Sequence, residues 1–171
     1  MIVSDAYSAV PWQTFLAAET GAAASLTGLL FVAVSINLDR ILSFPKLPAR
    51  AGETLTLLLL VVAIASLGMA PQSPRALAAE IIACAAGASG VVLSVQLRHG
   101  PDDPSDPIWW YLTRIATIQI PALLFLAGGV TLILRHGGGM YWILAATLAG
   151  FAGAVYTAWV LLVEIIRQHP Q

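Results

Sequence analysis

Long apolar stretches alternate with short polar segments along the whole chain. Five stretches have about the 20 mostly apolar residues that a helix needs to cross a bilayer, and they occupy residues 12–38, 52–70, 76–97, 108–134 and 140–166. Segments rich in proline and glycine separate them, and such segments form turns. The pattern therefore predicts an all-α integral membrane bundle of about five transmembrane helices, with residues 1–171 forming a single domain.

The composition supports this prediction. Hydrophobic residues make up 58% of the 171 positions and charged residues only 10%, whereas a soluble domain has about 25% charged residues. A soluble fold of this size could not bury so much apolar surface, so the excess must face lipid. The first apolar stretch is too long for a cleaved signal, and we expect it to stay in the mature protein. The net charge of −1 provides no basic field, so we expect no nucleic-acid partner.

The basic residues predict the orientation in the membrane. With five spans, six of the eight lysines and arginines fall on one side: Arg40, Lys46, Arg50, Arg98, Arg114 and Arg167. Only Arg75 and Arg135 fall on the other side, with the N-terminus. Because cytoplasmic loops carry an excess of basic residues, we expect the N-terminus outside and the C-terminus in the cytoplasm. The predicted location is the cell inner (plasma) membrane, with the lipid bilayer as the first partner.

Small residues recur at helical spacing in three of the stretches. In lipid, helices associate through close packing of such residues, so we interpret them as helix-packing faces or, alternatively, as part of a pore or ligand site. The positions are Gly21, Ser25 and Gly28 in the first stretch, Gly87 and Gly90 in the third, and Gly153 in the fifth. The second stretch is rich in leucine, which predicts the most lipid-exposed helix. Pro121 should kink the fourth, because its ring frees the carbonyl of Thr117.

A candidate polar site lies within the apolar stretches. It consists of Glu19, Asn37 and Glu80. A charge in the hydrocarbon costs about 2.5–3.5 kcal/mol on insertion scales, so each carboxylate should face protein or water. Glu19 is the deepest, and a helical wheel places it on the face of Asn37, nearly opposite the Gly21 and Gly28 stripe, while Glu80 has a similar depth. An ion or proton site, a solvated carboxylate and a protonated carboxyl are the alternatives for Glu19.

A second group of ionisable residues is predicted on the cytoplasmic side. Glu53, Arg114 and Glu164 lie at comparable depths on three different helices. A cation between two carboxylates lowers the cost of holding all three charges near the bilayer. The group is predicted to be an ion-pair cluster that fixes this end of the bundle or, alternatively, the lower part of an ion or proton relay that begins at Glu19 and Glu80.

The sequence lacks the usual motifs of catalysis and metal binding. His99, His136 and His169 lie at the ends of the apolar stretches, so no pair of histidines is placed to bind haem. No zinc-protease, serine–histidine or phosphate-loop motif occurs. The single cysteine, Cys84, stands in an apolar helix, where cysteine is more often a packing residue than a nucleophile. We expect no catalytic residue, no metal and no cofactor, and we predict that the protein is not an enzyme.

The first third of the chain resembles a known group of proteins. Residues 41–48 (ILSFPKLP) mix apolar and basic side chains and are expected to lie on the lipid headgroups. Together with the preceding helix they are similar to small bacterial multi-helix membrane proteins, in which T-G-L-L-F-V-A-x-S-x-N is followed by R-I-L-x-x-P-x-L-P-x-R-A. The matching residues here are Thr27 to Asn37 and Arg40 to Ala51. Some members of the group carry the label "modulator of FtsH protease". The resemblance implies that Asn37 and the linker belong to a shared design.

Two functions are compatible with these features. The first is a homo-oligomeric channel or transporter-like assembly, with the pore between subunits because five short helices leave little room for one inside. The second is an accessory or assembly subunit of a larger membrane complex, or a modulator of a membrane protease, which the small extramembrane part and the linker favour. A membrane enzyme or redox protein is a third, less favoured hypothesis. We favour the oligomer, because the small-residue surface exceeds what one five-helix bundle needs.

Overall fold

The structure is a bundle of long helices. The computed structural model describes residues 5–44, 47–100 and 108–167, without the side chains of 99, 161–162 and 164–167. The long helices are α2 (Gln13–Ile36), α4 (Leu47–Met69), α5 (Pro74–His99), α6 (Ile108–Leu134) and α7 (Met140–Arg167), and all five are long and apolar enough to cross a membrane. The 3-10 helix η1 (Val10–Trp12) precedes α2, and the short helix α3 (Leu38–Leu42) follows it. The prediction of an all-α, multi-pass membrane protein is confirmed.

The predicted helix boundaries agree with the structure to within a few residues, with one exception. α4 begins at Leu47 rather than at residue 52. Pro48 is compatible with this start, because the N–H groups of the first helical turn have no partner within the helix. α5 also has a proline in its first turn, since Pro74 is its first residue. The Ser73 side chain caps this helix by accepting a hydrogen bond from the Ala76 N–H at 3.2 Å.

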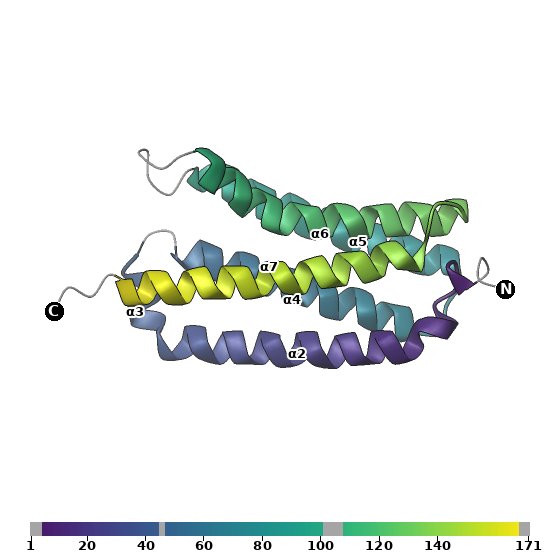
Figure 1. Ribbon diagram of the computed structural model, residues 1–171, viewed down its shortest axis with the longest axis horizontal. Helices are drawn as coiled ribbons and strands as arrows, with labels where there is room; N and C mark the ends of the chain where they lie inside the picture. Colours follow the sequence, from purple (N-terminus) through teal and green to yellow (C-terminus); the bar gives the residue numbers. More distant parts are fainter. Residues whose placement is uncertain (1–4, 45–46, 101–107, 168–171) are drawn as a thin grey trace.

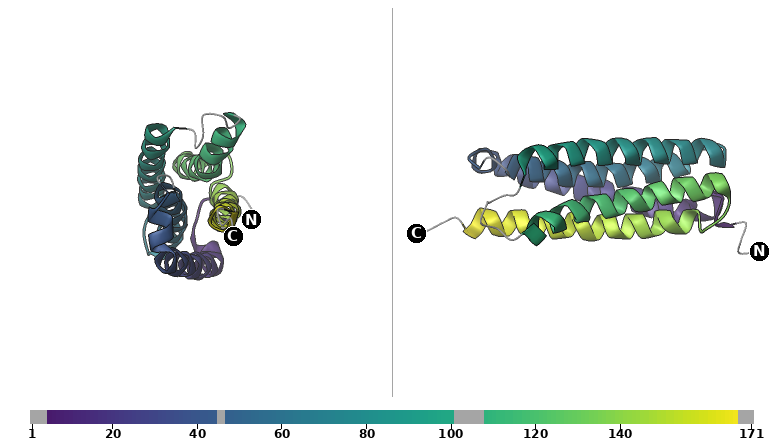
Figure 2. Two further views of the ribbon diagram at one scale, coloured as in Figure 1. Left: turned by 90° about the vertical axis from the view of Figure 1, so that its left-hand side faces the viewer. Right: turned by 90° about the horizontal axis from the view of Figure 1, so that it is seen from above.

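Successive helices run antiparallel and form a bundle with a central helix (Figures 1 and 2). The end-on view in Figure 2 shows α5, α4 and α2 side by side, while α6 packs on α5, and α7 packs on both α6 and α4. α2 packs mainly against α4, whereas α4 contacts α2, α5 and α7. α4 is therefore central and α2 lies at an edge. We call the end at which α2 ends, α4 begins and α7 ends the C-terminal end of the bundle.

The leucine-rich helix is not the one that faces lipid. Half of the membrane-spanning window of α4 is buried, against 11% of the window of α2. The prediction that the second apolar stretch forms the most lipid-exposed helix is therefore wrong. Leucine is as compatible with lipid as with protein, so its abundance does not indicate which helix faces lipid. The long side chains of α4 instead interlock with those of its neighbours, and such contacts add dispersion energy.

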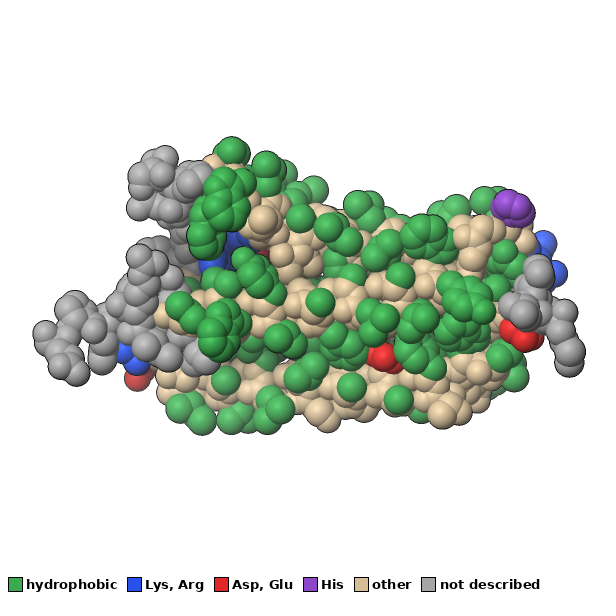
Figure 3. Space-filling view, viewed as in Figure 1, with side chains coloured by type: hydrophobic (Ala, Val, Ile, Leu, Met, Phe, Trp, Pro, Cys, Tyr) green, Lys and Arg blue, Asp and Glu red, His purple; other side chains and the backbone are tan. Residues whose placement is uncertain are grey.

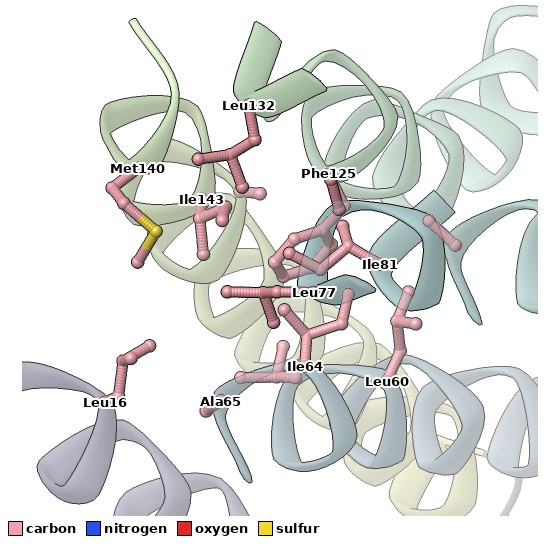
Figure 4. Packing of buried hydrophobic residues seen from close by; sticks show 14 of the residues in the cluster. Leu16, Leu60, Ile64, Ala65, Leu77, Ile81, Phe125, Leu132, Met140 and Ile143 are labelled. Atoms are coloured by element: carbon pink, nitrogen blue, oxygen red, sulfur yellow. The ribbon is translucent and has the colours of Figure 1, made fainter. Parts of the chain in front are cut away.

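All five long helices contribute to one hydrophobic core (Figure 4). Phe125 of α6 is fully buried, and Ile64 of α4 and Ile81 of α5 point toward it. Leu16 of α2 and Ile143 of α7 belong to the same cluster and are each 1% exposed. Apolar side chains from every long helix therefore fill this part of the bundle.

A glycine turn joins α6 to α7 and receives the N-terminal segment. The three glycines at 137–139 have φ angles of 91°, 120° and 49°, a conformation that other residues rarely adopt. The Met140 N–H donates to the Ala6 carbonyl at 2.8 Å, and a Cβ on Gly139 would collide with the same carbonyl. The glycines therefore allow the N-terminal segment to pack closely on this end of the bundle.

Part of the predicted headgroup-bound linker packs on the protein itself. A small buried cluster at the C-terminal end consists of Ile41 of α3 with Leu47 and Ala51 of α4. Val34 of α2 and Phe44 pack against this cluster. Residues 45 and 46 lie outside the described part of the chain, so the predicted position of Lys46 at the headgroups is not described. The apolar part of the linker thus connects α2 to α4.

Candidate functional site

A pocket opens at the C-terminal end between α4, α6 and α7. Its lining includes Arg50, Glu53, Arg114, Thr117, Tyr156 and Thr157. The cavity volume is about 30 Å³, within about 420 Å³ of empty space that includes the open mouth. Figure 3 shows basic and acidic side chains together in an opening between α6 and α7, toward the left-hand end of the molecule. The pocket therefore opens on the long side of the bundle.

The bend of α6 makes room for this pocket. Pro121 lies in the middle of α6 and has no backbone N–H, so the carbonyl of Thr117 loses its helical partner. Gly153 of α7 lies directly against that carbonyl, because a Cβ at Gly153 would be only 2.9 Å from the Thr117 oxygen. The first part of α6 bends away from α7 (Figure 1). The proline kink thus separates the two helices where the pocket lies.

An ion pair between α4 and α6 lies in the pocket. The Arg114 Nε donates to Glu53 Oε2 at 3.2 Å, and the Arg114 Nη2 donates to Glu53 Oε1. The side chains of Arg114 and Glu53 are 8% and 3% exposed. The bidentate geometry matches a planar guanidinium to a planar carboxylate, and each charge compensates the other where an unpaired charge would be costly. The structure thus brings together two of the three residues of the predicted cytoplasmic cluster.

Two residues without a predicted role complete this network. Gln96 of α5 is fully buried, and its Nε2 donates to Glu53 Oε2 at 3.2 Å. The Tyr111 hydroxyl donates to the backbone carbonyl of Gln96 at 3.1 Å. A signal for Gln96 was present in the sequence, because an amide inside an apolar stretch needs a polar partner. Glu164, the third residue of the predicted cluster, lies in α7, and its side chain is outside the described residues.

The three residues of the predicted intramembrane polar site do not form one site. Glu80 Oε2 accepts a hydrogen bond from Gln72 Nε2 at 2.9 Å, in the connection between α4 and α5. Asn37 follows the last residue of α2, and its Nδ2 donates to the Ala33 carbonyl at 2.9 Å. Within the described ranges, no hydrogen bond joins Glu19, Asn37 or Glu80 to another of the three. Each has its own surroundings.

Glu19 has the most unusual surroundings of the three. It lies between Leu16 and Ala23, the two buried residues of α2, and the spacing places all three on one face of the helix. The side chain is half-buried, and its Oε2 has no hydrogen-bond partner in the described part of the structure. An unpartnered carboxylate oxygen at this place is costly.

The predicted packing residues divide into one that packs within the subunit and five that face outward. Gly153 is buried against α6. The exposed ones are Gly21, Ser25 and Gly28 on α2 and Gly87 and Gly90 on α5. A Cβ added to any of these four glycines would meet no atom within 4 Å. The small-residue stripes on α2 and α5 therefore do not pack against other helices of the described subunit.

Among the described residues, two buried side-chain oxygens have no hydrogen-bond partner, Glu19 Oε2 and Gln96 Oε1, and only the first belongs to a carboxylate. Both oxygens of Glu53 accept hydrogen bonds from Arg114, and one of them also accepts from Gln96, so this carboxylate has little capacity left for a metal ion. Three features therefore bear on function: the outward-facing small-residue stripes of α2 and α5, Glu19, and the pocket between α4, α6 and α7. No protein-family model, curated protein or solved structure matches this chain.

Proposed function

We propose that the protein is a homo-oligomeric channel or transporter-like assembly of the cell inner membrane, with its N-terminus outside and its C-terminus in the cytoplasm. The observation that carries the proposal is the state of α2. Its small-residue stripe faces away from the subunit, while Glu19, on the opposite face, keeps a buried carboxylate oxygen without a partner among the described residues. The stripe supports association between copies, and Glu19 supports an ion or proton site.

The open stripes support association because of how helices interact in lipid. Small residues let two helix backbones approach closely, and this packing drives association where the hydrophobic effect does not. The stripe of Gly21 and Gly28 is on α2, and that of Gly87 and Gly90 is on α5. Figure 2 shows α2 and α5 on opposite sides of α4. A subunit with open faces on two edges is suited to contact two copies, as a closed ring requires.

Glu19 supports the passage of a cation or proton. Ionisable side chains within membrane helices are rare and tend to mark ion or proton pathways, because a charge there is costly. The described structure pairs Glu53 with Arg114, and Glu80 with Gln72. Glu19 Oε2 has no such partner among the described residues. It is therefore the carboxylate to which we assign binding of the transported ion or proton.

Flux measurements in liposomes test this proposal. The full chain is reconstituted with a pH-sensitive or cation-sensitive dye inside the vesicles, and Glu19→Gln is compared with the wild type. We expect the variant to lose about tenfold in flux or more, which corresponds to about 1.4 kcal/mol of lost ion binding. Asp39→Asn neutralises an exposed carboxylate on α3 and serves as the matched control with unchanged flux. No flux at any pH, or equal flux in Glu19→Gln, would contradict the proposal.

The alternative function is that of an accessory or assembly subunit of a larger membrane complex, or a modulator of a membrane protease. Apolar side chains on α3 favour it, since Leu38 and Leu42 are 46% and 61% exposed at the C-terminal end, where another protein would cover them. Purification in a gentle detergent separates the two functions. A second protein in fixed stoichiometry would favour the accessory role, and an isolated homo-oligomer would favour the channel.

A further inference from the structure

Glu19 lies on the face of α2 that packs on its own subunit. It stands between Leu16, which is 1% exposed, and Ala23, which is fully buried, and the helical spacing places the three on one face. A Cβ on Gly68 of α4 would be only 2.7 Å from Leu16 Cδ1, so α4 lies directly against this face. The small-residue stripe of α2 is on the opposite face. A second copy that packs on the stripe therefore does not reach Glu19.

The charged residues of the neighbouring elements lie at the other end of the bundle. η1, α3, α4 and α7 pack against α2. Their charged residues, of which the last two are placed by the backbone alone, are Asp39, Arg40, Arg50, Glu53, Glu164 and Arg167. Counted along α4 from Gly68, which lies beside Leu16, Glu53 is about 22 Å away. At the near end, Asp5 is exposed before η1, and the Tyr7 hydroxyl accepts a hydrogen bond from the Gly138 N–H at 3.4 Å. No described cation pairs with Glu19 Oε2.

A metal ion finds few ligands at Glu19. Hard cations take about six oxygen ligands. α2 is a continuous α-helix from Gln13 to Ile36, so its carbonyls near Glu19 accept helical hydrogen bonds, and the Leu16 carbonyl also accepts from the Thr20 hydroxyl at 2.8 Å. Among the residues that the structure describes, no group of three or more histidines, cysteines, aspartates and glutamates could hold a metal ion. One carboxylate beside apolar side chains is a poor site for a metal cation.

A proton needs only one oxygen. Its binding converts the carboxylate into a neutral carboxyl group, and a neutral group is far less costly than a charge in an apolar environment. The neutral carboxyl has one O–H donor and keeps acceptor capacity on its oxygens. A single buried oxygen without a partner among the described residues therefore suits a proton better than a metal ion.

We propose that the ion carried by Glu19 is a proton and not a metal cation. In the uptake step, a hydronium ion transfers its proton to a carboxylate oxygen of Glu19 and leaves as water, and release reverses this step. The inference rests on the proposed channel or transporter-like function, which leaves the ion open. It places the proton on the face of α2 inside the subunit, and not at the contact between copies.

Ion selectivity in liposomes tests this inference. The full chain is reconstituted, and proton entry is followed with a pH-sensitive dye, while Na⁺ and K⁺ entry are followed in separate vesicles with dyes selective for these ions. We expect proton entry in the wild type and in Glu19→Asp, and its loss to the level of protein-free vesicles in Glu19→Gln. Na⁺ and K⁺ entry should stay at that level in every variant. Asp39→Asn changes an exposed carboxylate on α3 and should conduct protons like the wild type.

The outcomes separate this inference from the proposed function. Entry of Na⁺ or K⁺ that Glu19→Gln abolishes would support a transport function and overturn the proton assignment. Proton entry that is unchanged in Glu19→Gln would also overturn the assignment. Entry of neither protons nor metal ions in the wild type would contradict the transport function itself, and this inference with it.

Infrared spectroscopy of the protein in lipid gives a readout that does not depend on flux. The C=O stretch of a protonated carboxyl group is separate from the bands of carboxylates and amides. We expect this band in the wild type and in Asp39→Asn, with a shift in D₂O, and its loss in Glu19→Gln. If Glu19→Gln does not fold by gel filtration, added NaCl at constant pH decides with the wild type alone. An unchanged band supports the proton assignment, and a band that Na⁺ removes would overturn it, because the metal ion then displaces the proton.

Discussion

α2 and α4 are both apolar helices of membrane-spanning length, yet they have opposite surroundings. The mean hydropathy of their most apolar windows is 1.5 for α2 and 1.9 for α4, and the buried share of these windows is 11% and 50%. The more hydrophobic helix is the central one, in contact with α2, α5 and α7. Hydropathy therefore indicates that a helix lies in the membrane, but it does not indicate whether protein or lipid surrounds that helix.

The glutamates of the two helices also differ in their hydrogen-bond partners. Glu53 on α4 is bound by Arg114 of α6 and Gln96 of α5, whereas Glu19 on α2 has an oxygen with no partner in the described ranges. The polar contacts of α4 connect three helices and bear on stability. The unused carboxylate and the open stripe of α2 bear on function, because nothing inside the described subunit accounts for them.

The largest effect should come from breaking the polar contacts of the central helix. Glu53→Ala removes the carboxylate that binds Arg114 and Gln96, and the loss of one partner of a buried ion pair costs about 3–5 kcal/mol. We expect the free energy of unfolding to fall by about 3 kcal/mol, at the low end of this range, because the pocket is open on one side. Reversible unfolding in mixed detergent and dodecyl sulfate micelles measures the change.

Two further variants make this test specific to the ion pair. Asp39→Ala removes an exposed carboxylate at the same end of the bundle, and it should change the free energy of unfolding by less than about 0.5 kcal/mol. Glu53→Leu combined with Arg114→Met replaces both charges by apolar groups and should recover most of the lost stability. If Glu53→Ala were as stable as the wild type, the pair would not connect α4 to α6 in the way described.

A smaller effect should follow from shortening one isoleucine on each helix. Ile64 of α4 is 1% exposed and Ile36 of α2 is 78% exposed. Ile64→Ala leaves a cavity in the core and should cost about 2 kcal/mol, mainly through lost packing, since lipid also solvates an isoleucine. Ile36→Ala should leave the free energy of unfolding nearly unchanged. Equal losses in the two variants would mean that α2 is as closely packed as α4.

The five helices and the Glu53–Arg114 contact could be predicted from the sequence. Apolar stretches of membrane length are a property of the chain itself, and opposite charges at one depth of a small bundle lower each other's cost. The central position of α4 could not be predicted, because leucine packs equally well on lipid and on protein. The role of Gln96 was missed because an uncharged amide in a long apolar stretch does not change the hydropathy that defines the helix.

Gly28 and Gly153 show that the partner of a packing face could not be predicted from the sequence either. In the sequence each belongs to a series of small residues at helical spacing. In the structure Gly153 lies against the Thr117 carbonyl, which has no hydrogen-bond partner within α6 because Pro121 lacks an N–H. Nothing lies within 4 Å of a Cβ on Gly28. The difference is that a neighbouring helix, α6, lies against Gly153, whereas no helix of the described subunit lies against Gly28. No pattern within α2 or α7 alone contains that information.

Alanine at these two glycines should produce the smallest effect on stability. Gly153→Ala would place its Cβ 2.9 Å from the Thr117 oxygen and 3.0 Å from Thr117 Cγ2, so α6 and α7 must move apart. We expect a net loss of about 1 kcal/mol in the free energy of unfolding, after the better helix propensity of alanine offsets part of the strain. Gly28→Ala meets no atom in the subunit and should leave its stability unchanged or slightly raised.

The same two variants separate the stability of the subunit from the association of copies. If the stripe of α2 is the contact between copies, Gly28→Ala holds two helix backbones apart and shifts the oligomer toward monomer in native mass spectra. Gly153→Ala should lower the free energy of unfolding and leave the distribution of oligomers unchanged. An unchanged oligomer in Gly28→Ala would mean that this stripe faces lipid, because a methyl group on a lipid-facing surface disturbs no contact between proteins.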